Sequence, residues 1–594
     1  MKYLRKLPAL FLVIFILSRC AHPLSPSGGA KDVTPPQVLE TKPENGSAHF
    51  VGNKFTIEFD EFISLEKISE EGLISPPLSE QPDFKVKGKS LQVKFNEPLK
   101  PNTTYSVYFG DAIVDITEKN PLSNYTYIFS TGDYVDSLSM QGEVIDAFNL
   151  EPIEDAFVML YKNNNDTLPF DSLPLAVKPY YLSKTDENGK FMFHGLADEK
   201  YMLFALNDLN RSYIFDQPGE GIAFLDSLVS PQYIKPIIND TAVIDSTLLI
   251  NSDSISTEII DSSFSKVDSL QTEKPDEEQL VNYELFLFTH KDTVQKLLKA
   301  ELFKRNTLRF SFSMPAANIS FKPLNFDLDS TWFNSEYSIE KDTITWYLKT
   351  LPVDTLQLLI SNNNDTLEQL DIRLIPKKKL TGRKKKKDEA EKKEFLKWET
   401  NVQKRNLVLD QQAEITFEQP IINTYTDSAW FATKEDTIYK LDFAFIDSIH
   451  RQIRIPFELE EDSKYSIYFP DSAFTDWNGL HNKAIFLEIF TKSLREYGTF
   501  VINLHPFENQ SYILQLLGAK ESVARQHFFQ GDTSITYNYV DPKKYLLKII
   551  FDDNNNGKWD AGNYLLKKQP EKVIYFLKEV NVRANWEIEE DWEF

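Results

Sequence analysis

Apolar and polar residues alternate along most of this chain in short segments, and Asn, Asp, Gly and Pro separate one segment from the next. A period of two places successive side chains on opposite faces of a strand, so that one face enters a core and the other meets water. Segments of this kind, rich in Val, Ile, Phe, Tyr and Thr, are typical of β-sandwiches. Regular examples are residues 55–59 (FTIEF), 91–95 (LQVKF), 105–109 (YSVYF) and 125–129 (YTYIF). The pattern predicts an all-β, multidomain string of sandwiches.

The alternating segments repeat within the chain. Three pairs of segments match in the same order at nearly constant offset: 55–59 with 413–417 (AEITF), 105–111 (YSVYFGD) with 465–471 (YSIYFPD), and 128–130 (IFS) with 489–491 (IFT). Internal repetition is the signature of duplicated structural units. It predicts two copies of one sandwich, at residues 34–133 and 397–494.

A second repeat is interleaved with the first. Residues 200–208 (KYMLFALND) align without a gap on residues 544–552 (KYLLKIIFD), and in both copies an Asp/Asn loop follows the strand. The predicted domains span residues 137–227 and 495–594. In the first copy we expect a hairpin at Asn188-Gly189, because both positions of such a turn favour positive φ.

Two resemblances support this division. Residues 142–206 resemble the carboxypeptidase regulatory-like, transthyretin-type β-sandwich through the run TDENGKF…F…GL…Y. Residues 34–133 are similar to the bacterial Ig-like domain of surface-layer and secreted proteins through FDE, L.PNTTYSV and the closing F.T. With the SGGAKD segment at 27–32, the combination resembles a family of Ig-like-domain lipoproteins of the Bacteroidetes group. That resemblance implies a fold and a compartment, and it carries no activity.

Other parts of the chain have different compositions. Residues 228–279 are rich in Ser, Asp and Thr and are expected to form an acidic disordered linker. Residues 280–376 return to β patterning, for example at 283–288 (YELFLF), and predict a further sandwich. Residues 377–396 form a basic linker with a helix-compatible end. Its run RKKKK at 383–387 has two interpretations, a site for anionic headgroups or other polyanions and a solvated linker.

The single cysteine, Cys20, follows a basic N-terminus and about ten apolar residues at 8–17. Ten residues are too few to cross a bilayer of about 30 Å as a helix, so a cleaved signal is the better interpretation. The segment LSRC at 17–20 is similar to a lipobox, which predicts lipidation of Cys20. Arg19 keeps an ordinary secretory signal open, because Gly, Ala or Ser normally precedes a lipoprotein cysteine.

The domain order that follows begins with a lipoprotein signal peptide at residues 1–20 and a flexible Pro/Gly-rich tether at residues 21–33. In the group that the chain resembles, acidic residues directly behind the cysteine accompany export to the cell surface. Residues 21–24 (AHPL) contain none. We therefore expect an outer-membrane lipoprotein on the periplasmic face.

Composition narrows the classes of function. The 594 residues carry 65 Lys and Arg against 89 Asp and Glu, a net charge of −24. Such acidity argues against nucleic-acid binding, which needs a basic face. Without a second cysteine the mature chain has no disulfide, so its stability must come from hydrophobic cores.

The best candidate site is the loop after residue 551. Oxygen-bearing groups follow calcium-loop spacing, with a glycine, Gly557, at the sixth position. The predicted ligands are Asp552, Asn554, Asn556, the carbonyl of Lys558, and Asp560. Asn563 stands where a bidentate Glu normally closes such a loop, so the expected affinity is weak; a polar β-turn is the alternative.

The sister loop after residue 207 keeps the oxygens but has Tyr213 in place of the glycine, and a structural turn is favoured there. Its oxygen-bearing residues are Asp208, Asn210, Ser212 and Asp216.

Catalytic motifs are missing from the sequence: no His-Glu-x-x-His, no Gly-x-Ser-x-Gly and no phosphate loop occurs. We therefore expect a non-enzymatic cell-envelope lipoprotein, held to the membrane by its lipid anchor, that acts as a structural or binding scaffold for envelope proteins or glycans. Accessory carbohydrate binding is the alternative, and an unrecognised hydrolase would require a pocket with convergent carboxylates. The aromatic candidates for sugar stacking are Trp477, Trp559, Trp586 and Trp592.

Overall fold

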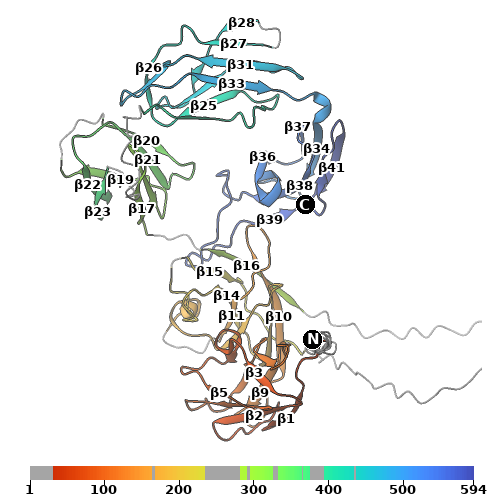
Figure 1. The fold of residues 1–594 in the computed structure, drawn as a ribbon. Helices are drawn as coiled ribbons and strands as arrows, with labels where there is room; N and C mark the ends of the chain where they lie inside the picture. The colour runs from red at the N-terminus through yellow and green to blue at the C-terminus, as the bar shows by residue number, and fades with distance from the viewer. Residues whose placement is uncertain are drawn as a thin grey trace, which may run out of the picture. The chain divides into compact units, whose positions relative to one another are not determined.

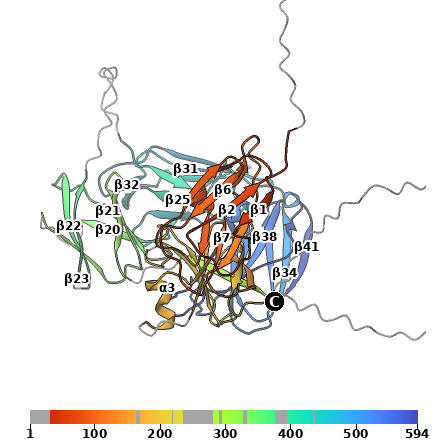
Figure 2. The same ribbon diagram turned by 90° about the horizontal axis from the view of Figure 1, so that it is seen from below.

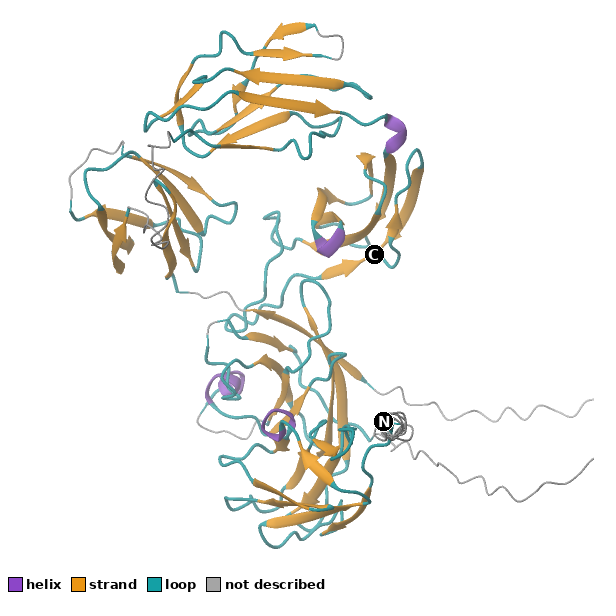
Figure 3. Ribbon diagram, in the orientation of Figure 1, coloured by secondary structure: helices purple, strands orange, loops and turns teal. Residues whose placement is uncertain are grey.

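The computed structural model describes residues 31–162, 168–217, 219–233, 281–289, 294–325, 332–363, 365–374, 394–433 and 437–594. Strands dominate this part of the chain (Figure 3), so the predicted all-β class is confirmed. The predicted signal peptide with Cys20, and most of the tether and of both linkers, lie outside the described residues.

The described residues fall into two compact units. The first contains those of Met1–Val144, Pro152–Phe215 and Phe224–Leu285, and the second those of Ile145–Glu151, Asp216–Ala223 and Phe286–Phe594. We call the successive sandwiches domains A to E and define each by its strands.

Domain A opens the first unit. Its sheets have the strand orders β1-β2-β6-β5, β4-β7-β9 and β3-β8, and Figure 2 shows β1, β2 and β6 side by side. The alternating residues expected to point inward, among them Phe55, Ile57 and Phe59, are at most 1% exposed and share one core. Its elements are β1 (Val38–Lys42), β2 (Lys54–Phe59), β3 (Ile63–Leu65), α2 (Ile68–Glu71), β4 (Leu73–Ser75), β5 (Asp83–Lys87), β6 (Ser90–Lys94), β7 (Thr104–Tyr108), β8 (Ile113–Asp115) and β9 (Thr126–Ser130).

Domain B follows in the same unit. β11 pairs with β12 and β14, while β10 pairs with β13. Its elements are β10 (Leu138–Asp146), β11 (Phe157–Tyr161), η1 (Phe170–Ser172), α3 (Leu173–Ala176), β12 (Tyr181–Lys184), β13 (Lys190–Leu196) and β14 (Met202–Asn207).

The expected hairpin at Asn188-Gly189 is only half right. The turn exists, and Gly189 has a φ of 73°, while Asp186 Oδ1 accepts the N–H groups of Asn188 and Lys190. The flanking strands β12 and β13, however, pair with β11 and β10 respectively. The turn therefore connects two strands that do not pair with each other. The turn residues predict the reversal of the chain but not which strands pair on either side of it.

Residues 283–288, expected in the third sandwich, form part of β16 (Asn282–Thr289). Thr289 and Phe288 pair with β15 (Gly221–Phe224), upstream of the acidic segment. Alternation predicts a strand but does not specify its partner, which explains the difference.

Domain C, in the second unit, has two sheets of orders β17-β18-β21-β20 and β19-β22-β23. Trp346 is 1% exposed at its centre, and the ring of Phe333 stacks on it at a centroid distance of 4.2 Å. The strands are β17 (Leu297–Lys304), β18 (Thr307–Phe312), β19 (Ile319–Pro323), β20 (Phe333–Tyr337), β21 (Thr343–Leu348), β22 (Thr355–Asn362) and β23 (Asp365–Arg373).

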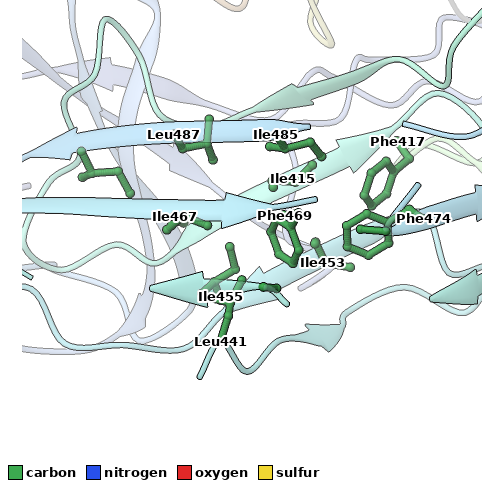
Figure 4. Close-up of a cluster of buried hydrophobic side chains, with 14 of the residues drawn as sticks. Ile415, Phe417, Leu441, Ile453, Ile455, Ile467, Phe469, Phe474, Ile485 and Leu487 are labelled. Carbon is green, nitrogen blue, oxygen red and sulfur yellow. The ribbon is translucent and has the colours of Figure 1, made fainter. Parts of the chain in front are cut away.

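Domain D repeats the sheet orders of domain A. β24-β25-β30-β29 corresponds to β1-β2-β6-β5, β27-β31-β33 to β4-β7-β9, and β26-β32 to β3-β8; β28 is added beside β27. Figure 4 shows its core, where Ile415, Ile467 and Ile485 meet with 0% exposure. The strands are β24 (Trp398–Thr400), β25 (Ala413–Phe417), β26 (Ile421–Thr424), β27 (Trp430–Ala432), β28 (Ile438–Lys440), β29 (Ala444–Phe445), β30 (Gln452–Ile455), β31 (Lys464–Phe469), β32 (Phe474–Asp476) and β33 (Ile485–Phe490).

Domain E repeats the pairings of domain B. β35 pairs with β36 and β38, and β34 pairs with β37; β41 adds to β34 in parallel. Its elements, after η2 (Leu494–Glu496), are β34 (Gly498–His505), β35 (Ser511–Leu517), η3 (Ala519–Glu521), β36 (Val523–Gln530), β37 (Thr533–Val540), β38 (Lys544–Phe551), β39 (Val573–Tyr575), β40 (Val580–Asn581) and β41 (Glu587–Glu593).

Single hydrogen bonds are duplicated as well. Thr131 Oγ1 accepts the N–H of Thr103 and donates to the carbonyl of Lys100. In domain D, Thr491 Oγ1 accepts the N–H of Ser463 at 3.0 Å and donates to the carbonyl of Glu460. Thr131 is therefore the counterpart of Thr491. The closing segment 489–491 thus corresponds to residues 129–131, one residue later than the sequence match with 128–130.

Candidate functional site

The predicted calcium loop follows β38 and is closed by its first residue. Asp552 is 3% exposed. Its Oδ1 accepts the N–H of Asn556 at 2.9 Å and its Oδ2 accepts the N–H of Gly557 at 2.8 Å. Gly557 has a φ of 78°, in the left-handed region that glycine adopts without strain. The loop thus turns back over the first carboxylate.

The other predicted ligands converge on Asp560. The side-chain nitrogens of Asn554 and Asn556 donate to Asp560 Oδ2, while the side-chain oxygens of both amides accept backbone N–H groups of the loop. Across the described ranges, no group of three or more His, Cys, Asp or Glu is placed to hold a metal ion. A calcium ion here would therefore depend on rotated Asn amides and on the carbonyl of Lys558.

The carboxylate that bonds to the backbone of this loop belongs to Glu571, and not to the twelfth residue of the loop, Asn563. Glu571 is 1% exposed; its Oε2 accepts the N–H of Asp560 at 2.8 Å and its Oε1 that of Asp553 at 3.1 Å. Burial raises the pKa of Glu571, and the charges of Asp560 and Asp552 add to this effect. Asn563 instead closes a turn with Lys568. Glu571 lies outside any twelve-residue spacing, so no sequence signal identified it.

The sister loop has the same local hydrogen bonds. Asp208 Oδ2 accepts the N–H of Tyr213 at 2.7 Å, and Tyr213 adopts a φ of 58° at the position of Gly557. A bulky side chain in this conformation is strained, which agrees with a structural turn more than with an optimised ion site. Separately, Glu220 is 0% exposed and accepts the N–H of Asp216 at 3.1 Å, as Glu571 does for Asp560.

The four predicted tryptophans lie in different environments. Trp592 is 8% exposed in the core of domain E, whereas Trp586 is 60% exposed. The indole N–H groups of Trp559 and Trp477 donate to the carbonyl of Glu571 and to Gln419 Oε1. A different tryptophan, Trp430, lies beside Tyr468, with the two ring centroids 5.5 Å apart. The basic run at 383–387 lies outside the described residues.

No helix within the described ranges is long and apolar enough to cross a membrane.

Comparisons with known proteins match one domain clearly. Residues 32–131, which contain all strands of domain A, match the family model of the bacterial Ig-like domain. No curated protein matches the sequence.

Solved structures give weak likenesses only. The native alpha-2-macroglobulin fragment from Escherichia coli is 13% identical with a TM-score of 0.17, over 48% of this chain and 97% of that one. The major pilin subunit BcpA of Bacillus cereus is 8% identical with a TM-score of 0.13, over 77% and 99%. The surface-layer protein SbsC is 10% identical with a TM-score of 0.13, over 92% and 67%. At these scores the likenesses carry no argument about function, and the match to residues 32–131 identifies the chain as one that contains a bacterial Ig-like domain.

Proposed function

We propose that this chain is a lipid-anchored scaffold of the bacterial cell envelope that binds or spaces other envelope components and catalyses no reaction itself. The observation that carries the proposal is the duplicated A–B and D–E arrangement, in which both domain types keep their strand pairings. Repetition of whole sandwiches extends the surface that a chain presents. The bacterial Ig-like domain at residues 32–131 agrees with a role outside the cytoplasm.

Cys20 is the proposed point of attachment. Several acyl chains on one cysteine hold a protein to a membrane far better than one chain does. Mass spectrometry of the mature N-terminus should find an acylated Cys20, and Cys20→Ser should move the protein from the outer-membrane fraction to the soluble fraction. An unmodified Cys20, or cleavage elsewhere, would leave a secreted scaffold without an anchor, as Arg19 allows.

The periplasmic face of the outer membrane is the proposed location, because residues 21–24 lack acidic side chains. A membrane-impermeant amine reagent applied to intact cells should then modify the protein only after the outer membrane is opened. Ready modification in intact cells would place the chain on the surface instead.

The scaffold itself is tested by cross-linking in native membranes. Envelope proteins or peptidoglycan fragments should be recovered with the wild-type chain, and their recovery should be lower for Cys20→Ser, which lacks the proposed point of attachment. Equal recovery in both samples would contradict a membrane-bound scaffold.

Accessory carbohydrate binding is the second candidate, and one observation favours it. Trp430 and Tyr468 lie on one sheet face with ring centroids 5.5 Å apart and planes 24° apart. Aromatic faces of this kind can stack on sugar rings. Isothermal titration with cellohexaose and chitohexaose should then give binding that Trp430→Ala abolishes; no binding would exclude these two glycan classes.

A further inference from the structure

Domain E carries an insertion that domain B lacks. In both domains a buried glutamate accepts the N–H of an aspartate in the preceding loop, Glu220 for Asp216 and Glu571 for Asp560. Three residues separate the first pair and ten separate the second, so the loop of domain E is seven residues longer. The extra residues fall within 561–570, between β38 and β39, which are both labelled in Figure 1. Insertions in one copy of a repeat often lie on a binding surface.

Hydrogen bonds fix the insertion as a tight turn. Asn563 and Lys568 exchange backbone N–H···O bonds of 2.7 and 2.9 Å, and Asn563 Oδ1 accepts the N–H of Leu566 at 3.0 Å. Inside the turn, Tyr564 is 1% exposed, and Nζ of Lys567 lies 3.6 Å from its ring centroid. The tip therefore has a defined conformation before it meets a partner, which lowers the entropic cost of binding.

Two adjacent leucines at the tip face solvent. Leu565 is 53% exposed and Leu566 is 75% exposed. Neither belongs to the two hydrophobic clusters described for domain E. The leucines therefore add little to the stability of the domain, whereas their burial against an apolar partner would be favourable.

The flank of the tip is basic. Residues 561–570 contain Lys567 and Lys568 and no Asp or Glu, although the chain as a whole has a net charge of −24. Both lysines are exposed. An apolar tip beside ammonium groups is complementary to an anionic bilayer, in which acyl chains lie directly beneath negatively charged headgroups.

The base of the insertion is occupied by a contact within the second unit. A Cβ built on Gly562 would lie 2.5 Å from the ring of Phe288, so only glycine permits this close approach. The contact involves a residue before the turn and leaves Leu565 and Leu566 exposed. It accounts for the position of the base, and it does not account for the two leucines.

We propose that the turn at 564–568 binds the surface of an anionic phospholipid bilayer. Leu565 and Leu566 enter the acyl boundary, and Lys567 and Lys568 lie at the headgroup phosphates. A single short apolar element holds a protein to a membrane weakly and reversibly, so the turn is a second, weaker contact beside any acyl anchor. The proposal goes beyond the scaffold function and does not depend on lipidation of Cys20.

Vesicle flotation with residues 21–594 tests the proposal, because this chain lacks Cys20 and contains every described residue. It should float with vesicles of phosphatidylglycerol and phosphatidylethanolamine at low salt and remain unbound with vesicles of phosphatidylcholine. The double substitution Leu565→Ser with Leu566→Ser should raise the dissociation constant for the anionic vesicles roughly tenfold or more.

Leu577→Ser is the matched control in the same domain. Leu577 is 100% exposed, but the lysine beside it, Lys578, lies 3.9 Å from a carboxylate oxygen of Glu590. This variant should bind the anionic vesicles as the wild type does. Equal losses for Leu577→Ser and for the double substitution would contradict a specific role of the turn.

A single thiol label reports insertion directly. Residues 21–594 contain no cysteine, so Leu566→Cys and Leu577→Cys each create one labelling site. A nitrobenzoxadiazole label at position 566 should shift its emission to the blue and become protected from iodide when anionic vesicles are added. The same label at position 577 should show neither change.

Three outcomes would overturn the proposal. The first is a chain that does not bind the anionic vesicles, and the second is a label at position 566 that stays in water while the chain binds. The third is binding that survives the double leucine substitution and is lost when the basic run at 383–387 is replaced by Gln. That result would assign membrane binding to the basic run.

Discussion

The ammonium group of Lys548 lies 3.2 Å from the ring centroid of Phe148, within the second unit. Lys548 is 1% exposed on β38, and the ring of Tyr575 lies 5.4 Å from its Nζ. Burial lowers the pKa of Lys548 to about 8, although the negative charges of Glu521 and Asp146 act to raise it. An aromatic face attracts a cation, but it does not replace the water that a buried ammonium loses.

Lys548→Met should therefore raise the free energy of unfolding at pH 7, by at most about 3 kcal/mol. The folded-state pKa lies below the ordinary value of 10.5, so the unfolded chain binds more protons between pH 8 and 10.5. Wild-type stability should rise with pH through this window, and below pH 8 the full cost remains. Scanning calorimetry at pH 7 and pH 10 should show a higher melting temperature for the variant at pH 7 and a smaller difference at pH 10.

Lys544→Met is the control for the same strand. The Lys544 side chain is 67% exposed and pairs with Glu579 at the surface, so its loss should change the melting temperature little at either pH. A lower melting temperature for Lys548→Met at pH 7 would show that the contact with Phe148 outweighs the desolvation cost.

Calcium at millimolar concentration should raise the melting temperature of the domain E transition, because the loop at 552–560 has the spacing of weak extracellular calcium sites with Kd of about 10⁻⁴ to 10⁻³ M. A chelator should reverse the shift. Asp552→Ala should abolish it, and also lower the calcium-free melting temperature, since Asp552 binds two backbone N–H groups.

Asp553→Ala is the matched control for the calcium response. Asp553 is exposed and is not one of the predicted ligands, although its backbone N–H binds Glu571. This variant should keep the full calcium shift. If calcium leaves the wild type unchanged, the loop is a polar turn.

Thr491→Val should destabilise domain D by about 1 to 3 kcal/mol. The substitution keeps the shape of the side chain but leaves the N–H of Ser463 and the carbonyl of Glu460 without the hydroxyl that joins them. Thr491 is 7% exposed, so water replaces it poorly. Thr131→Val should have a similar effect in domain A, whereas Thr424→Val, at an exposed position of β26, should be nearly neutral. Urea unfolding followed by proteolysis of the opened domain measures each change.

The alternation of side chains predicted the strands well. The segments at 55–59, 91–95 and 105–109 form most of β2, β6 and β7, with their apolar residues in one core. A period of two encodes which face is buried, and that property is local. The duplicated motifs likewise pointed to repeated sandwiches, and equivalent strand orders are found.

Features that depend on distant partners could not be predicted. The strand that contains residues 283–288 pairs with β15, which lies about 60 residues earlier in the chain. Local alternation gives no information about a partner so distant in sequence. Glu571 reaches the calcium loop from outside its spacing, and Trp430 meets Tyr468 only because β27 and β31 are neighbours. Residue type alone marks Trp477, Trp559, Trp586 and Trp592 as candidates for sugar stacking, but it does not indicate which face of a sheet each side chain occupies.

Asp115 and Asp476 occupy corresponding positions at the ends of β8 and β32, but their carboxylates are bonded differently. Backbone N–H groups of Glu118, Lys119 and Asn120 reach both oxygens of Asp115. Although burial acts in the other direction, these bonds hold the pKa of Asp115 below its usual value. Asp476 is 0% exposed, its Oδ1 accepts two N–H groups, and its Oδ2 is buried without a hydrogen-bond partner. Burial raises the pKa of Asp476.

Asp476→Asn should therefore be at least as stable as the wild type at pH 7, and Asp115→Asn should be less stable. Because the folded-state pKa of Asp476 is raised, the folded chain binds the proton more tightly than the unfolded chain does. Its contribution to stability falls as pH rises above about 4 and stays low at neutral pH. The folded-state pKa of Asp115 is lowered instead, so its contribution to the free energy of unfolding is lost as the pH falls. Melting temperatures at pH 3, 5 and 7 should show the difference between variant and wild type rising with pH for Asp476→Asn and falling with pH for Asp115→Asn. Parallel behaviour of the two variants would mean that the free oxygen of Asp476 finds a partner in solution.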